Sequence, residues 1–94
     1  MHGLSNETYS KIKKVIDKYP EAKFRLFGSR ARGDYKYNSD IDLAVTEEIS
    51  PYTMTKIRMD FLDLNIIYTI DVVDIKNCKN EKLIDNVLKE GVDF

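Results

Sequence analysis

Apolar residues recur at intervals of three and four positions in three stretches of this chain, which is the spacing of one helix face. The first stretch predicts a helix over residues 6–19, with Ser5 or Asn6 as its N-cap and Pro20 as its end. The second predicts a helix over residues 52–64. Each apolar stripe marks the side of its helix that packs against a core.

The third stretch predicts a last helix that is capped by Asn80 and runs through Lys89. Gly91 follows it as a C-terminal stop. The chain has no internal repeat and no linker rich in glycine, serine or proline. We therefore expect one structural unit from the first helix to the last.

Alternating and β-branched segments between these helices predict three strands, over residues 23–28, 40–45 and 66–75. A single helical turn is expected at residues 29–32, after the first strand. The order of elements is α-β-(turn)-β-α-β-α. This order predicts an α/β or α+β fold, with a small mixed sheet of about three strands flanked by helices.

The length of 94 residues suits one domain, spanning residues 1–94, and excludes a second. The chain has one cysteine, Cys78, so it has no internal disulfide framework and we expect a reducing compartment. Its start lacks the apolar run of a secretory signal. Its densest apolar stretch, residues 64–73, is far shorter than the ~20 residues of a membrane helix. These features predict a small cytoplasmic protein that does not enter a membrane.

The formal net charge of −1 conceals an uneven distribution. Residues 1–36 carry nine Lys and Arg and four Asp and Glu, whereas residues 37–75 carry two basic and eight acidic residues. A basic first third beside an acidic middle suits a site for a metal-bound polyphosphate, although charges on separate surfaces would give the same pattern. The near-neutral total makes a dedicated nucleic-acid binder unattractive, and no direct nucleic-acid contact is expected.

Two carboxylates, Asp40 and Asp42, stand two positions apart on the second predicted strand, so both project from one face of it. Side chains from such a base can hold divalent cations about 3.5–4 Å apart, the spacing of two-metal phosphoryl chemistry. A bound Mg²⁺ would also relieve their mutual repulsion. By itself the pair is weak evidence, because solvated carboxylates at a strand edge look the same.

A glycine and a serine, Gly28 and Ser29, follow the first predicted strand and open the helical turn. Glycine lets the backbone approach a phosphate closely, and free N–H groups with the serine hydroxyl bind phosphate oxygens. Arg30 and Arg32 lie in the same stretch and would add charge-assisted contacts. A plain turn with a solvated basic loop is the alternative interpretation of these residues.

The distance in the chain between the Gly28-Ser29 turn and the Asp40 and Asp42 pair is stronger evidence for a function than either feature alone. At average residue usage, Gly-Ser separated by ten residues from Asp-x-Asp arises by chance in about one chain of this length in a thousand. The chain carries two matching runs: Gly28-Ser29-Arg30-Ala31-Arg32-Gly33 and Ser39-Asp40-Ile41-Asp42-Leu43. With them it resembles the minimal nucleotidyltransferases of the DNA-polymerase-β-like superfamily, the antitoxins paired with HEPN-domain toxins. The resemblance extends over nearly the whole chain.

The resemblance implies a third carboxylate on a later strand, and Asp71 and Asp74 are the two candidates. Three positions apart on a strand, they point to opposite faces, so only one can join Asp40 and Asp42. A charge in mid-strand among β-branched neighbours is costly without a partner or a role. Asp74, near the strand end, can be solvated. We therefore favour Asp71, which also agrees with the family pattern.

The resemblance further implies an enzyme that transfers AMP from ATP to a hydroxyl acceptor, with Mg²⁺ as cofactor and a two-metal site. Asp40, Asp42 and Asp71 would bind metal and act in catalysis, and the Gly28-Ser29 turn would bind the nucleotide. Other motifs do not fit: the chain has no Gly-Lys-Ser/Thr phosphate loop, and its one His and one Cys make zinc improbable.

The chain is too short to carry a domain that grips the acceptor, so the acceptor must come from a partner. The resemblance implies a HEPN-domain ribonuclease toxin, modified on a tyrosine, which makes the chain a protein adenylyltransferase and an antitoxin. Two alternatives remain. One is an antitoxin that neutralises its toxin by binding alone, and the other is nucleotidyl transfer to a small molecule or an RNA end.

Overall fold

The computed structural model describes residues 1–94. The elements, in chain order, are α1 (Asn6–Asp17), β1 (Phe24–Phe27), α2 (Ser29–Arg32), β2 (Ile41–Val45), α3 (Pro51–Leu62), β3 (Ile70–Asp74), the 3-10 turn η1 (Ile75–Asn77), α4 (Glu81–Glu90) and β4 (Val92–Asp93). Two caps act as predicted, because the side chains of Ser5 and Asn80 each accept a backbone N–H from the first turn of α1 and α4. Ser50, which is not among the predicted caps, caps α3 in the same way.

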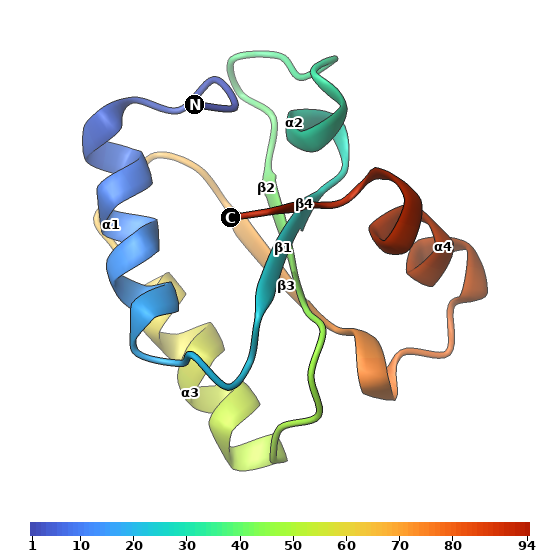
Figure 1. Ribbon diagram of the computed structural model, residues 1–94. Helices are drawn as coiled ribbons and strands as arrows, with labels where there is room; N and C mark the ends of the chain where they lie inside the picture. The colour runs from blue at the N-terminus through green and yellow to red at the C-terminus, as the bar shows by residue number, and fades with distance from the viewer.

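The four strands form one sheet in the order β3-β2-β1-β4. β2 pairs with β3 in parallel, whereas β1 runs antiparallel to both β2 and β4. Helices lie on both sides of this sheet, with α1 and α3 on one side and α4 on the other (Figure 1). The sequence prediction of a mixed α/β fold is therefore confirmed. No helix of the chain has the length and apolar character needed to cross a bilayer.

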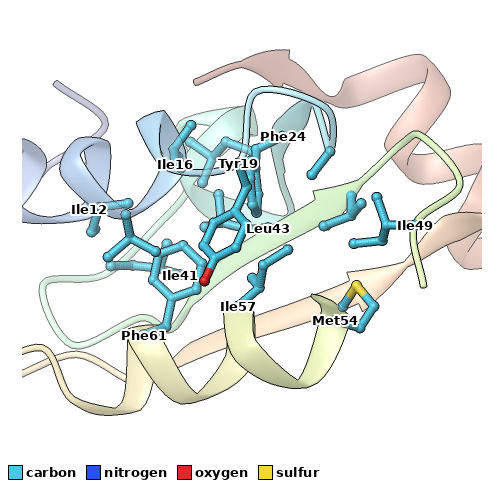
Figure 2. Packing of buried hydrophobic residues seen from close by; sticks show 14 of the residues in the cluster. Ile12, Ile16, Tyr19, Phe24, Ile41, Leu43, Ile49, Met54, Ile57 and Phe61 are labelled. Atoms are coloured by element: carbon cyan, nitrogen blue, oxygen red, sulfur yellow. The ribbon is translucent and has the colours of Figure 1, made fainter. Parts of the chain in front are cut away.

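The core lies between the sheet and the helices α1 and α3 (Figure 2). Alternation along β2 directs Ile41, Leu43 and Val45 to this side, where all three are fully buried. Ile12 of α1 and Ile57 of α3 pack there and are fully buried as well. This layer holds the fold together because it removes most of the apolar surface from water.

The opposite face of the sheet is covered only by α4. Its buried cluster has three members, Phe27, Ala44 and Val87. Leu83 of α4 and Val73 of β3 pack against them and are half-buried. α4 covers one part of this face, and the remaining part carries the acidic side chains described below.

Two predictions about strands need correction. The third strand is shorter than the predicted residues 66–75, because only Ile70–Asp74 pairs with β2. Ile66 and Tyr68 pack against the core from an irregular connection, so apolar character there reflects burial and not strand pairing. The sheet also has a fourth strand, β4. Its backbone hydrogen bonds come from the distant β1, which no local pattern reveals.

Candidate active site

Two carboxylates lie side by side on the face of the sheet that α4 leaves open. Asp42 of β2 and Asp71 of β3 are direct partners in the parallel ladder. Paired residues of neighbouring strands point to the same face, and their Cα atoms stand about 4.8 Å apart. The sheet therefore forces two acidic groups, 29 positions apart in the chain, into one small region.

The turn after β1 borders Asp42 from the other side. Phe27, the last residue of β1, pairs with Asp42, so Gly28 follows directly beside that carboxylate. Gly28 has a φ of 75°, a conformation that favours glycine. A Cβ built on it would lie 2.4 Å from Oδ2 of Asp42. Only a glycine lets the backbone turn approach the carboxylate so closely.

Helix α2 starts from this turn at Ser29 and ends at Gly33, which adopts the left-handed conformation with φ 95°. The first N–H groups of a helix have no partner within it, and they carry partial positive charge. They open beside Asp42, next to the half-buried Ser29. This arrangement can bind phosphate oxygens close to a carboxylate-held cation.

Asp40, Asp42 and Asp71, which we name the acidic row, repel one another. Burial raises the pKa of the Asp42 carboxyl, and repulsion from Asp71 and then from Asp40 raises that pKa further. Arg32 acts in the opposite direction and lowers it. A cation bound to these oxygens would relieve the repulsion. The charge of this region therefore favours a positively charged ligand.

Asp40 lies immediately before β2 and is exposed. It is close enough to raise the pKa of Asp42, but the three carboxylates do not converge as a finished metal site. The structure thus brings Asp42 and Asp71 together and leaves Asp40 beside them.

Asp74, the other candidate for the third carboxylate, lies three residues beyond Asp71. It pairs with Val45 at the far end of β2, away from Asp42. Its Oδ2 accepts a hydrogen bond from Nδ2 of Asn77 at 2.8 Å. The parallel register therefore places Asp71, and not Asp74, beside Asp42.

The two arginines of α2 occupy different environments. Arg32 is exposed, and its guanidinium pairs with Asp34 (Nε to Oδ1, 3.3 Å) and with Glu90 of α4 (Nη1 to Oε2, 3.2 Å). It still lowers the pKa of Asp42, so its charge reaches the acidic row. Arg32 is therefore the α2 arginine whose charge acts on Asp42, while its guanidinium is paired with Asp34 and Glu90.

Arg30 is turned inward and is 1 % exposed. Its guanidinium donates two hydrogen bonds to the carbonyl oxygen of Ser39 (3.1 and 2.8 Å) and one to that of His2 (3.0 Å). The rings of Tyr35 and Tyr68 lie against it, 5.2 and 4.6 Å from its Cζ atom. This placement corrects the expectation of a phosphate contact: the Arg30 side chain fastens the loop before β2 to the protein interior.

A cavity of about 550 Å³ extends from Asp42 across β3 to α3. Apolar groups form most of its wall, and the polar ones are Asp42, Asp71 and Arg58. The apolar wall consists of Phe27, Leu62, Ile70, Val72, Val73 and Leu83. Cavities of this size and composition bind small molecules or single side chains.

Arg58 and Leu62 are cavity residues that the sequence alone did not reveal. Both belong to α3, where a four-residue spacing places them on the same side of the helix. Nη2 of Arg58 donates a hydrogen bond to the carbonyl oxygen of Val72 at 3.2 Å. Arg58 is one of three charged residues on α3, with Lys56 and Asp60, and this pattern is typical of a solvated helix face. Only the packing of α3 against β3 brings Arg58 to the site.

Comparisons with known proteins agree with the fold. A family model described as polymerase beta nucleotidyltransferase matches residues 10–93. A crystal structure of a toxin–antitoxin with AMP-PNP is 27 % identical to this chain, with a TM-score of 0.66, and the match covers 95 % of this chain and 72 % of the other. A candidate nucleotidyltransferase from Sulfolobus solfataricus is 28 % identical, with a TM-score of 0.53, over 93 % of this chain and 75 % of the other.

A candidate minimal nucleotidyltransferase has a similar fold, with a TM-score of 0.70 at 22 % identity, and the match covers 94 % of this chain and 93 % of the other. None of the curated protein sequences matches the chain significantly.

Proposed function

This chain belongs to the polymerase beta nucleotidyltransferase family, and we propose that it transfers AMP from ATP to a hydroxyl group of a partner protein, with Mg²⁺ as cofactor. The observation that carries the proposal is the direct pairing of Asp42 with Asp71 beside the Gly28 turn. It combines two hard oxygen ligands with a backbone turn that suits phosphate, and nucleotidyl transfer needs both.

The residues present fit a magnesium site by their chemistry. All three candidate ligands, Asp40, Asp42 and Asp71, offer carboxylate oxygens, and burial, followed by repulsion from Asp71 and Asp40, raises the pKa of Asp42. Bound there, Mg²⁺ would neutralise charge that develops on the transferred phosphoryl group. Asp42 and Asp71 would hold it from adjacent strands, and Asp40 would complete the set from the loop.

Each element of the site then has a role. The N–H groups at the start of α2 and the Ser29 hydroxyl bind the phosphates of ATP. Arg32 adds positive charge beside them. Asp71, the most exposed of the paired carboxylates, accepts the proton of the acceptor hydroxyl as that oxygen attacks the α-phosphorus and pyrophosphate leaves. Arg30 contributes through its backbone, because its side chain is buried.

The acceptor in this proposal is a tyrosine hydroxyl of a HEPN-domain toxin, and the chain is its antitoxin. The similarity to a structure of a toxin–antitoxin with AMP-PNP supports a nucleotide and a toxin as ligands. The apolar cavity beside Asp71 suits an aromatic acceptor side chain. An antitoxin that acts by binding alone would require neither the pairing of Asp42 with Asp71 nor the glycine at position 28 beside Asp42.

The test uses the purified chain, ATP labelled at the α-phosphate, Mg²⁺, and the protein encoded by the neighbouring gene. The partner should gain the mass of one or more AMP units. Asp42→Asn and Asp71→Asn should each lower the transfer rate by about a hundredfold or more, because each removes a charge aimed at the reacting phosphate. Asp74→Asn, the matched control on the same strand, should transfer at the wild-type rate.

Three results would contradict the proposal. Undiminished transfer by Asp42→Asn would exclude the acidic row as the catalytic centre. Loss of transfer in Asp74→Asn with full transfer in Asp71→Asn would reverse the choice of third carboxylate. Toxin neutralisation without any gain in mass, with and without ATP and Mg²⁺, would make the chain an antitoxin that acts by binding alone.

A further inference from the structure

Three large apolar side chains are exposed at the end of α3 and in the connection that leads to β3. Met59 is 58 % exposed, Leu62 82 % and Ile67 91 %. We name these three residues the apolar rim. Met59 and Leu62 are three positions apart on α3 and share one side of it. Large exposed apolar groups mark candidate interaction surfaces.

The apolar rim is continuous with the active site. Leu62 is a wall residue of the cavity that contains Asp42 and Asp71. Ile67 lies in the chain segment between Leu62 and Ile70, and Ile70 also lines that cavity. A molecule resting on the rim would therefore reach the acidic row without crossing another surface.

The edge of β3 next to the rim is largely unpaired. β3 is the outer strand of the sheet, and the N–H of Ile41 in β2 donates to the carbonyl oxygen of Thr69. In a parallel ladder this register turns the backbone groups of Ile70 and Val72 away from β2. One of them, the carbonyl oxygen of Val72, accepts from Arg58. An open strand edge is a surface that another polypeptide recognises.

The direction of attack also selects this side, and here the inference rests on the proposed function. In phosphoryl transfer the attacking and leaving oxygens lie roughly in line, on opposite sides of the phosphorus. The Gly28 turn, which would hold the leaving pyrophosphate, adjoins Asp42 from the β1 side. The acceptor must then approach from the β3 side, where the apolar rim lies.

The chemistry of this side favours a protein acceptor. Apolar side chains as large as Leu62 and Ile67 gain nothing from a nucleotide or an RNA backbone. The exposed carboxylate of Asp63, outside the proposed metal set, would repel the phosphates of a nucleic acid. Two basic groups near this edge are engaged with the backbone: Arg58 donates to the carbonyl oxygen of Val72, and Lys11 donates to that of Asn65.

We propose that the apolar rim and the adjoining edge of β3 are the docking surface for the acceptor protein, whose own apolar patch covers Leu62 and Ile67 while its acceptor side chain enters the cavity. The partner is recognised by apolar contact and backbone pairing. Of the partner, only the acceptor side chain then reaches Asp71 in the cavity.

The experiment compares Leu62→Glu and Ile67→Glu with Leu88→Glu. Leu88 is 65 % exposed on α4, so it provides the same chemical change on another surface. Binding of the neighbouring gene's protein is measured by calorimetry, transfer by labelled ATP, and integrity of the site by the affinity for AMP-PNP with Mg²⁺. Both rim variants should bind the partner about thirtyfold more weakly and lose transfer in proportion. Ile67→Glu lies outside the cavity wall, so its affinity for AMP-PNP should stay at the wild-type value.

Leu88→Glu should behave as wild type in all three measurements. Wild-type partner binding by Ile67→Glu, which lies outside the cavity wall, would overturn the docking surface and leave the proposed function intact. Transfer by the wild-type chain to RNA or a small molecule alone would also overturn it. Dimerisation of the wild-type chain that Leu62→Glu abolishes would assign the rim to a second copy. A wild-type chain that binds the partner but transfers no AMP would refute the proposed function alone.

Discussion

The two faces of the sheet are built from the same strands and differ in what covers them. On the α1 and α3 side, fifteen buried residues form one continuous cluster. On the α4 side the buried cluster has only three residues, and Val87 is the only one of them that belongs to the ten-residue helix α4. One face is a complete core, and the other is partly open.

β2 shows what this difference does. Its residues alternate between the faces, so Leu43 is fully buried under α1 and α3 while its neighbour Asp42 emerges on the α4 side. The covered face supplies rigidity, and the open part of the other face holds the carboxylates at defined positions without enclosing them. A site on rigid strands keeps its geometry better than a site on loops.

The comparison predicts unequal costs of removing apolar groups. Ile57→Ala should lower the free energy of unfolding by about 2–5 kcal/mol, because it leaves a cavity in the fully covered core. Leu83→Ala on the half-covered face should cost no more than about 1.5 kcal/mol, since Leu83 is only half-buried. Urea denaturation of both variants measures the difference. Equal losses would mean that α4 contributes as much core as α1 and α3 do.

A second prediction tests how closely the backbone must approach the open face. Gly28→Ala should lower transfer about a hundredfold, because its Cβ would displace the carboxylate of Asp42. Gly33→Ala is the matched control: Gly33 also has a positive φ, but nothing lies within 4 Å of its added Cβ. Both variants should lose about 1–2 kcal/mol of stability from backbone strain, and only Gly28→Ala should lose activity. Similar activities would assign the effect to strain in α2 alone.

A third prediction concerns the hydrogen bond between Tyr19 and Asp60 on the covered side, which we name the latch. The Tyr19 hydroxyl donates to Oδ2 of Asp60 at 2.5 Å, which ties the chain after α1 to α3. Tyr19→Phe should lower the free energy of unfolding by about 1–2 kcal/mol without changing transfer. Tyr9→Phe is the control, because the Tyr9 ring stacks on Phe94 and contributes by packing.

The latch also has a pH signature. The hydrogen bond to Asp60, followed by burial, raises the pKa of Tyr19 to about 12 from the usual 10.0. The folded state then retains a proton that the unfolded state loses, so the extra stability is complete below pH 10 and lost as the pH rises through 12. The difference between wild type and Tyr19→Phe should shrink over that window. A constant difference across it would contradict the assigned hydrogen bond.

The smallest expected effect comes from burial and charge repulsion at Asp42 on the open face. The pKa of Asp42 is raised in the folded state, so the folded protein holds its proton more tightly than the unfolded chain and loses stability as the pH rises through that pKa. Asp42→Asn removes this loss. It should therefore raise the melting temperature at pH 7 and have no such effect below the ordinary pKa of 3.8.

Mg²⁺ should sharpen the same contrast. It should raise the melting temperature of the wild-type protein, because it binds the folded state at the acidic row. Asp42→Asn should respond much less. If Asp42→Asn melts below wild type at pH 7, or gains as much melting temperature from Mg²⁺, then the carboxylate of Asp42 is not destabilised by burial and by its acidic neighbours.

Much of this molecule follows from local sequence. Ser5 and Asn80 begin their helices where the pattern predicts, because a cap and an apolar stripe act within a few residues of each other. Gly28 and Asp42 were identified from their types and spacing. The sequence also limited the third carboxylate to Asp71 or Asp74, because residues three apart on a strand face opposite ways.

Contacts between distant segments decided the rest. The register of β3 against β2 placed Asp71 beside Asp42, and packing turned Arg30 inward although Arg32, two residues away, is exposed. The cavity that joins Leu62 to Asp71 exists only because α3 crosses the edge of β3. The sequence by itself determined the helices, the turn and the acidic pair, since short-range backbone and apolar spacing govern them. Only the tertiary structure decided which charges meet, because strand register and burial depend on residues far apart in the chain.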